Sequence, residues 1–271
     1  MAEFTHNDFV RIQRWFYDHT SINLKDNKKA LVSARWQKRI TQHGFSSLGE
    51  YFDFLNNDQS GVEEEIAINL LTTNETYFFR EPKHFEFMER VIIPRLLTTA
   101  TDRCVRIWSA AASTGQEAYT IALEFAQHYG IQRNWKILGT DVNSEVIRTA
   151  KRGVYTLEAS KRIPLELLKM YGAKGVGKDI GWFRFKDELR SKVNFTCHNL
   201  MKPLPTNTDF DVIFLRNVLI YFDLDDKKAI VNNMVDKLRP GAWLLVGHSE
   251  SISGYNDQLI QLKPGCYQKQ D

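Results

Sequence analysis

Very small residues follow an apolar stretch of this sequence at a place where a ligand could bind. In residues 106–123, RIWSAAASTGQEAYTIAL, a run typical of a β-strand gives way to small side chains and then to a helical pattern. The turn Ala110–Ala112 with Ser113 lets a ligand approach the backbone closely. Phosphate binding favours several glycines, because glycine adopts a positive φ readily. Gly115 is the one position with this conformational freedom here. The turn therefore favours a ligand without phosphates. Alternatively, the turn only packs a strand against a helix.

An acidic residue, Asp141 in the stretch ILGTDVN, ends the next predicted strand. A carboxylate at this point can accept hydrogen bonds from both hydroxyls of a ribose. Its spacing from the small-residue turn fits one strand–helix–strand unit. Alternatively, Asp141 or Asn143 caps the following helix, a role that both residue types fill well, and the two roles can coexist.

Polar residues also end two later predicted strands. The stretch CHNL ends one strand with Asn199, and FLRNVLIYF carries Arg216 and Asn217 after another. Because the carboxyl ends of parallel strands lie along one edge of a sheet, we expect these side chains to share a site with the small-residue turn. Alternatively, they only cap turns at the rim of the sheet.

These positions require a sheet of alternating strands and helices, which the sequence predicts from about residue 103. The continuous apolar strands favour an α/β fold with a mostly parallel, doubly wound sheet and right-handed crossovers. The hairpin predicted over 259–269 adds an antiparallel edge. The predicted strands are 105–111, 135–141, 193–200, 210–219 and 242–248, and the predicted helices are 116–130, 143–155 and 226–241.

The sequence predicts two domains and a connector. Residues 1–71 carry four helical patterns and form a small all-α domain. Residues 72–98 form a connector followed by a helix, and residues 99–271 form the sheet domain. Within it, the glycine-rich stretch 172–195 with its alternating WFRFK is predicted as an inserted antiparallel β-subdomain.

The composition argues against several classes of protein. The formal net charge of +3 is too small to indicate a nucleic-acid binder by itself. No apolar run approaches the ~20 residues of a membrane span, and the N-terminus lacks the pattern of a signal peptide, so we expect a cytoplasmic protein without membrane insertion. Three widely spaced cysteines indicate no disulfide framework, and no histidine pair with zinc-ligand spacing occurs.

The first 70 residues distribute their charge unevenly. Residues 25–43 are strongly basic, whereas residues 50–65 are acidic. On a helix, Lys28, Arg35 and Arg39 would fall within roughly 20° of one line. Such a stripe is usually a solvated basic face, and alternatively it docks an acidic partner.

Five motifs together resemble the CheR family. They are NETYFFRE, WSAAASTGQEAYTIA, GTDVN, RNVLIYFD and LVGHSES, in the order of the family across residues 74–250. Proteins of this family are S-adenosylmethionine-dependent methyltransferases that esterify glutamates on bacterial chemoreceptors. The helical front and the insertion at 172–195 also fit. The resemblance implies a Rossmann-like methyltransferase domain, S-adenosylmethionine as cofactor, S-adenosylhomocysteine as product and no metal.

The resemblance also implies roles for the matching residues. Glu117 would meet the methionine end of the cofactor near the sulfonium, and Asp141 would bind the ribose. Tyr221 would lie near the methyl group and the incoming glutamate, and Arg95 is a second catalytic candidate by its family position. Ala118 stands where the family usually has proline. The implied cofactor-binding residues are Asn74, Thr76, Arg80, Ala112, Gly115, Glu117, Asp141, Asn199, Leu200, Arg216 and Asn217.

The implied chemistry needs no general base. A glutamate side chain has an ordinary pKa of about 4.3, so at neutral pH it is ionised and can attack a methyl group without losing a proton. Positioning and the exclusion of water then carry catalysis. Two alternatives stay open: a methyltransferase of this fold acting on RNA or a small molecule, and a cofactor-binding adaptor without turnover.

The resemblance implies partners as well. Lys28, Arg35 and Arg39 would dock on the acidic methylation helices in the cytoplasmic region of a chemoreceptor, and we expect no nucleic acid. The insertion at 172–195 would hold a C-terminal receptor peptide as an added strand, or alternatively is a flap without a ligand. We expect a monomer.

Overall fold

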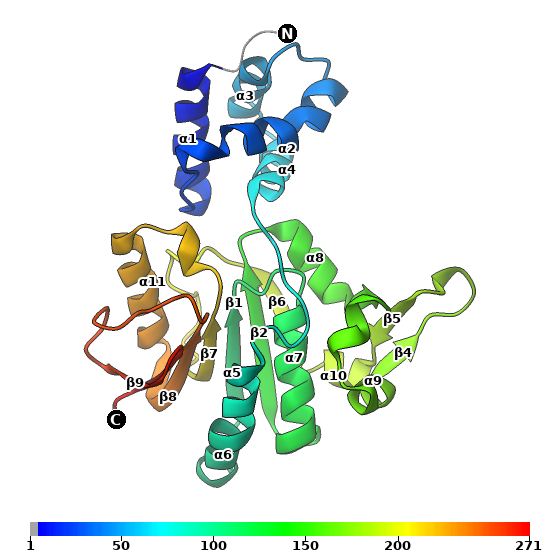
Figure 1. The fold of residues 1–271 in the computed structure, drawn as a ribbon, viewed down its shortest axis with the longest axis vertical. Helices are drawn as coiled ribbons and strands as arrows, with labels where there is room; N and C mark the ends of the chain where they lie inside the picture. Colours follow the sequence, from blue (N-terminus) through cyan, green and yellow to red (C-terminus); the bar gives the residue numbers. More distant parts are fainter. Residues whose placement is uncertain (1–4) are drawn as a thin grey trace. The chain divides into compact units, whose positions relative to one another are not determined.

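A computed structural model describes residues 5–271, and the chain divides into two units (Figure 1). Unit 1 contains Met1–Thr73 together with Tyr221–Asp223, and unit 2 contains Asn74–Ile220 and Leu224–Asp271. A three-residue segment from far along the chain thus groups with the N-terminal helices. Each helix found in residues 5–271 is too short or too polar to span a lipid bilayer.

Unit 1 is all helical, as predicted. Its helices are α1 (His6–Thr20), α2 (Lys29–Gln42), α3 (Leu48–Asn56) and α4 (Val62–Leu71), and a 3-10 turn η1 (Asp26–Lys28) precedes α2. Thr5 and Asp8 form a reciprocal capping box at the start of α1, and the Ser47 side chain caps α3. The apolar faces of the helices meet around Trp36, which is fully buried and donates its indole N–H to the Ala67 carbonyl at 3.1 Å.

The main sheet of unit 2 has seven strands in the order β6-β2-β1-β7-β8-β10-β9. The first five pair in parallel, and β10 pairs antiparallel with both β8 and β9. The mostly parallel sheet and its antiparallel edge are therefore confirmed. The strands are β1 (Val105–Ala110), β2 (Trp135–Asp141), β6 (Val193–Cys197), β7 (Phe210–Leu215), β8 (Leu238–Val246), β9 (Leu259–Lys263) and β10 (Cys266–Lys269).

Two helical connections join neighbouring parallel strands of the main sheet. The segment α7 (Gln116–Glu124) with the π-helical turn η3 (Phe125–Gly130) leads from β1 to β2, and α11 (Leu224–Asp236) leads from β7 to β8. These two crossovers leave in opposite directions, so their right-handedness puts α7 and α11 on opposite faces of the sheet. The adjacent strands β1 and β7 therefore form the switch point, where such sheets bind ligands.

Four further helical segments precede β1 or follow β2 in the chain. The connector leads into α5 (Pro82–Phe87), the π-helical turn η2 (Met88–Ile92) and α6 (Ile93–Thr99), which end before β1 (Figure 1). Helix α8 (Ser144–Arg152) follows β2.

The predicted helix 226–241 is shorter than expected, because β8 begins at Leu238 and includes Pro240 and Gly241.

A second, three-stranded antiparallel sheet lies beside α8 in unit 2 (Figure 1). Its order is β3-β5-β4, and it begins earlier than the predicted 172–195. The predicted helix 143–155 stops at Arg152, because Gly153 takes a left-handed φ of 61° and Val154 starts a strand. Val193 already belongs to the main sheet. The elements are β3 (Val154–Thr156), η4 (Ala159–Arg162), α9 (Leu165–Tyr171), β4 (Gly172–Lys174), η5 (Gly177–Asp179), β5 (Trp182–Phe185) and α10 (Asp187–Arg190).

Candidate functional site

The carboxyl ends of four neighbouring strands bring the predicted polar residues to one edge of the sheet. The pairing register places Ala110 of β1 beside Thr140 of β2 and beside Leu215 of β7, and Leu215 beside Val246 of β8. The residues that follow these strands are therefore neighbours, although they are far apart in sequence.

The small-residue turn after β1 is left-handed at three positions. Ala111, Ser113 and Gly115 have φ values of 69°, 48° and 96°, so Gly115 is not the one position of special freedom. A Cβ on Gly115 would lie 2.9 Å from the Ala150 Cβ and from the Tyr155 hydroxyl, so close packing requires a glycine there. The turn is therefore tightly packed as well as left-handed.

The Asp141 carboxylate braces this turn. Its Oδ2 accepts the Ser113 N–H at 2.9 Å, and its Oδ1 accepts the Asn143 N–H at 3.0 Å. Burial raises the pKa of Asp141. Asn143, and not Asp141, caps α8, since its side chain accepts from the N–H groups of Glu145 and Val146. Because a carboxylate oxygen can accept more than one hydrogen bond, Asp141 fits the predicted role towards ribose hydroxyls.

Arg216 lies between two carboxylates just after β7. Its side chain is 1% exposed, its Nη1 is 3.1 Å from Glu117 Oε2, and its Nη2 is 3.1 Å from Glu81 Oε2. Nη2 also donates to the Arg80 carbonyl. The second Glu117 oxygen accepts the Ser109 hydroxyl at 2.7 Å, and burial raises the pKa of Glu117. The structure therefore brings together Glu117 and Arg216, which the sequence predicted, with Glu81, which it did not.

Asn217 is held by two glutamates that sequence reasoning missed. Its side-chain amide donates to Glu81 Oε1 at 3.0 Å, and its backbone N–H donates to Glu250 Oε2 at 2.7 Å. The same Glu250 oxygen accepts the Gly247 N–H at 2.8 Å. Both glutamates lie inside quoted motifs, NETYFFRE and LVGHSES, so motif membership was the signal that could have found them.

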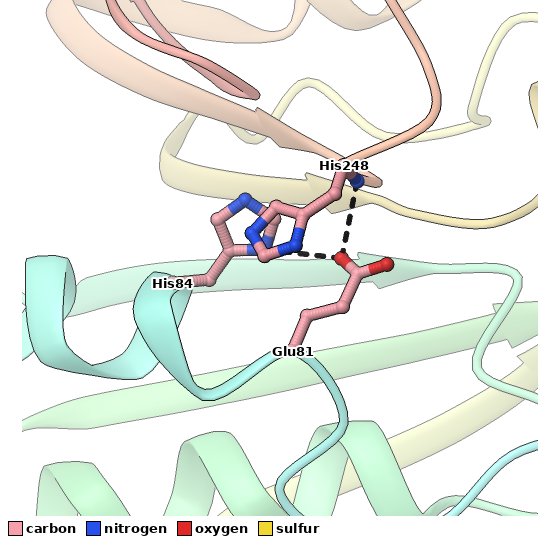
Figure 2. A group of neighbouring side chains, drawn as sticks. All are labelled: Glu81, His84 and His248. Atoms are coloured by element: carbon pink, nitrogen blue, oxygen red, sulfur yellow. Dashed lines mark hydrogen bonds and ion pairs between the residues drawn. The ribbon is translucent and has the colours of Figure 1, made fainter.

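Glu81 also lies beside two histidines, as Figure 2 shows. Glu81 Oε2 is 3.4 Å from Nδ1 of the buried His84 and accepts the backbone N–H of the exposed His248 at 3.3 Å. One ligand atom from each of the three side chains would fit within 4.8 Å of the others, a spacing that suits a metal ion. A cation there would compete with Arg216 for the same carboxylate.

Backbone strain gathers at this edge. Six non-glycine residues within 5–271 have a positive φ, and five belong to the segments that build the site. Such conformations cost energy and persist only where the surrounding contacts fix them, and they cluster at functional sites. The five are Phe79, Glu81, Ala111, Ser113 and Asn217.

The connector closes the site from a second side. Its Asn74 carbonyl accepts the Ser113 hydroxyl at 2.8 Å, and its Arg80 side chain donates to the Glu75 carbonyl at 2.8 Å. Thr76, between them, is half-buried.

The remaining cofactor candidates surround the ends of β1 and β6. Ala112 is buried and donates its N–H to the Thr140 carbonyl at 2.8 Å. After β6, the Asn199 side chain accepts the Met201 N–H at 3.0 Å, and Leu200 is buried.

The two catalytic candidates differ in their surroundings. Tyr221 groups with unit 1, where its carbonyl accepts the Asn23 N–H at 3.2 Å, so its catalytic role stays a prediction. Arg95 is exposed on α6, and that helix leads into the first residue of β1. Arg95 therefore lies towards the amino edge of the sheet, opposite the site, and its predicted catalytic role is corrected.

Arg35, predicted as part of a basic docking stripe, has an internal structural role. Its guanidinium donates to the carbonyls of Leu70, Leu71 and Thr72 at 3.2, 2.7 and 2.8 Å. These are carbonyls at the end of α4, which lack partners within the helix. Arg35 therefore caps α4 and is half-buried.

Arg39, the second arginine of the stripe, is paired with the buried Glu63. Its Nε lies 2.8 Å from Glu63 Oε1, and the Tyr51 hydroxyl donates to the same oxygen at 2.6 Å. Lys28 is exposed, but it ends η1 instead of lying on α2. The free basic stripe predicted for Lys28, Arg35 and Arg39 is therefore wrong, because the helix pattern could not show partners on α4.

A separate cavity of about 420 Å³ lies over the face of the main sheet. Its lining includes Arg106, Lys136, Thr196, His198 and Phe210, from β1, β2, β6 and the following loop. These side chains are different from the predicted site residues, so the chemistry at the strand ends does not depend on this cavity.

Comparison with known proteins agrees with this architecture. Residues 7–72 match the CheR methyltransferase all-alpha domain, and residues 74–266 match the CheR methyltransferase SAM binding domain. The chain is 35% identical over 272 residues to a chemotaxis protein methyltransferase of Borreliella burgdorferi, covering 98% of this chain and 95% of that protein. It is 37% identical over 249 residues to one of Escherichia coli, covering 90% and 84%. The chain therefore belongs to the CheR methyltransferase family.

Proposed function

We propose that this chain transfers a methyl group from S-adenosylmethionine to glutamate side chains in the cytoplasmic region of bacterial chemoreceptors. One observation carries the proposal: a left-handed Ala-Ser turn at the switch point is braced by the buried Asp141 and followed by the half-buried Glu117. The names of the two relatives, both chemotaxis protein methyltransferases, support the substrate class.

The donor set fits a cofactor with a ribose, a positive charge and no phosphate. Asp141 would accept the ribose hydroxyls, and Glu117 would face the sulfonium. The connector residues Asn74, Thr76 and Arg80 would close over the cofactor, and Arg216 and Asn217 would line its pocket. The remaining contacts would come from Ala112 and Gly115 in the turn and from Asn199 and Leu200 after β6.

Bound there, S-adenosylmethionine would supply the methyl group, which would leave its sulfur for a glutamate carboxylate oxygen and give S-adenosylhomocysteine and a methyl ester. The acceptor is already ionised at neutral pH, so the protein needs no general base. Its residues act by positioning, with Tyr221 near the methyl group and the incoming glutamate. The fixed contacts of Arg216 and Asn217 suit this task.

The test is methyl transfer to receptor-containing membranes with methyl-labelled S-adenosylmethionine. We expect label to enter the receptors and to leave as methanol in mild base, because methyl esters hydrolyse there. Base-stable label would refute the ester. Label on RNA without receptor would favour an RNA methyltransferase, and cofactor binding without any transfer would favour an adaptor.

We further propose that the small sheet binds a receptor peptide. Its order β3-β5-β4 leaves β4 at an edge, where an extended peptide can add a strand. Val176, Ile180 and Trp182 are exposed nearby and offer apolar contacts. A peptide from the receptor C-terminus should bind the chain in calorimetry, and Trp182→Ala should weaken that binding. Failure of every receptor peptide to bind would leave the sheet a structural flap.

A further inference from the structure

Glu81 joins several parts of the candidate site. One oxygen accepts the Asn217 amide at 3.0 Å, and the other lies 3.1 Å from Arg216 and accepts the His248 N–H at 3.3 Å. One carboxylate thus links the connector to the ends of β7 and β8. Building on the proposed function, we propose that Glu81 is a positioning residue that acts through Arg216 and gives the cofactor pocket its preference for a cationic ligand.

The backbone shows that this orientation is imposed. Glu81 has φ 57° and ψ 68°, a left-handed conformation that is unfavourable for a residue with a side chain. It also precedes Pro82, which restricts it further. Contacts to the carboxylate must therefore hold the residue in place, and the residue in turn holds its partners.

Glu81 offsets the charge of Arg216. Glu81 and Glu117 both contact the one guanidinium, each at 3.1 Å. Although burial raises the pKa of Glu81, the Asn217 hydrogen bond and the Arg216 charge outweigh it and lower that pKa. Glu81 is therefore ionised at neutral pH, and it offsets the positive charge that Arg216 presents towards Glu117. Without this offset, the guanidinium would repel a sulfonium placed near Glu117.

The neighbouring histidine keeps that charge intact. His84 is 1% exposed, and burial together with Arg216 lowers its pKa to about 3. It is neutral at physiological pH, so its approach to Glu81 at 3.4 Å is not an ion pair and does not cancel the carboxylate charge. In Figure 2 the His84 and His248 rings overlap in the view, and the Glu81 carboxylate lies beside them.

The experiment compares S-adenosylmethionine with S-adenosylhomocysteine, which lacks the methyl group and therefore the positive charge on sulfur. Calorimetry gives the Kd of each ligand for the wild-type chain and for Glu81→Gln. The substitution keeps the size of the side chain and removes one negative charge. We expect the Kd of S-adenosylmethionine to rise about tenfold and that of S-adenosylhomocysteine to rise by less than about threefold.

Two further variants separate charge from shape. Glu81→Asp keeps the charge, so it should keep the wild-type ratio of the two Kd values even if both ligands bind more weakly. Glu86→Gln, an exposed glutamate on the same helix, makes the same change of charge and should alter neither Kd.

An equal loss for both ligands in Glu81→Gln, or a changed ratio in Glu81→Asp, would overturn the inference. If Glu81→Gln does not fold, the ratio in Glu81→Asp still decides. A wild-type chain that binds neither ligand would overturn the proposed function itself, whereas wild-type binding with an unchanged Glu81→Gln would overturn this inference alone.

Discussion

Two arginine–glutamate clusters, one in each unit, contain the same residue types but have different roles. In unit 1, Arg39 meets Glu63, whose oxygen also accepts the Tyr51 hydroxyl at 2.6 Å. In unit 2, Arg216 meets Glu81 and Glu117. The first cluster places one guanidinium against one carboxylate on regular helices, whereas the second places one guanidinium against two carboxyl groups.

The backbone conformation also differs between the two clusters. Arg39 and Glu63 lie within α2 and α4, but Glu81 and Asn217 are both left-handed residues at element ends. A balanced cluster on relaxed backbone stabilises a fold. A guanidinium that faces two carboxyl groups on strained backbone is instead typical of a functional site. Charge balance and strain together therefore separate a structural ion pair from a binding site.

The largest expected effect comes from breaking the balanced cluster. Glu63→Ala leaves Arg39 and the Tyr51 hydroxyl without their buried acceptor, and we expect the free energy of unfolding to fall by about 3 kcal/mol. The cofactor Kd should stay unchanged. Urea denaturation and calorimetry measure the two quantities. Glu64→Ala, one residue along α4 and more exposed, is the control and should have little effect on stability. A large change in cofactor affinity would contradict the division of roles.

A smaller effect is expected from Asp141, an acid of the candidate site in unit 2. Asp141→Ala removes an acceptor for the ribose, and we expect cofactor binding to weaken by about 2 kcal/mol through lost charge-assisted hydrogen bonds. Calorimetry with S-adenosylmethionine measures this change. Asp209→Ala, an exposed acid before β7, should leave affinity unchanged. Unchanged affinity in Asp141→Ala would limit that residue to bracing the Ser113 turn.

The smallest effect tests a buried carboxylate that is paired with a histidine. Glu124 lies 3.6 Å from His128, and burial, with Glu89 nearby, raises the Glu124 pKa to about 7. The folded chain then holds this proton more tightly than the unfolded chain, so the stabilisation is lost as pH rises from about 4.5 to about 7. Glu124→Gln, which cannot ionise, should raise the free energy of unfolding at pH 8 and change it much less at pH 5. Thermal unfolding at both pH values decides, and an equal effect at both would show that Glu124 does not titrate there.

The sequence predicts the parts of the site that depend on local pattern. Apolar runs locate the strands, and polar residues directly after them, such as Asp141 and Arg216, must meet at the sheet edge. The family motifs then indicate a methyltransferase. The three-residue strand β3 is too short to have a pattern of its own, so the start of the small sheet at Val154 could not be predicted.

The rest depends on partners that are distant in sequence. Glu81 meets Arg216 across 135 residues, and only the folded connector shows that they pair. Arg39 looks free on a helical projection, yet Glu63 of α4 occupies it. Left-handed φ at Ala111 and Ser113 was equally hidden, because alanine and serine rarely adopt it without tertiary support.

The grouping of Tyr221–Asp223 with the N-terminal helices limits how the chain could be cut or recombined. The Asn23 side chain donates to Asp223 at 2.8 Å, and its N–H donates to the Tyr221 carbonyl. Deleting the first 73 residues would therefore strip a three-residue loop of its partners four positions after Asn217. A chimera that exchanges the helical unit between relatives would need to include this loop, because the unit is built from two separate segments of the sequence.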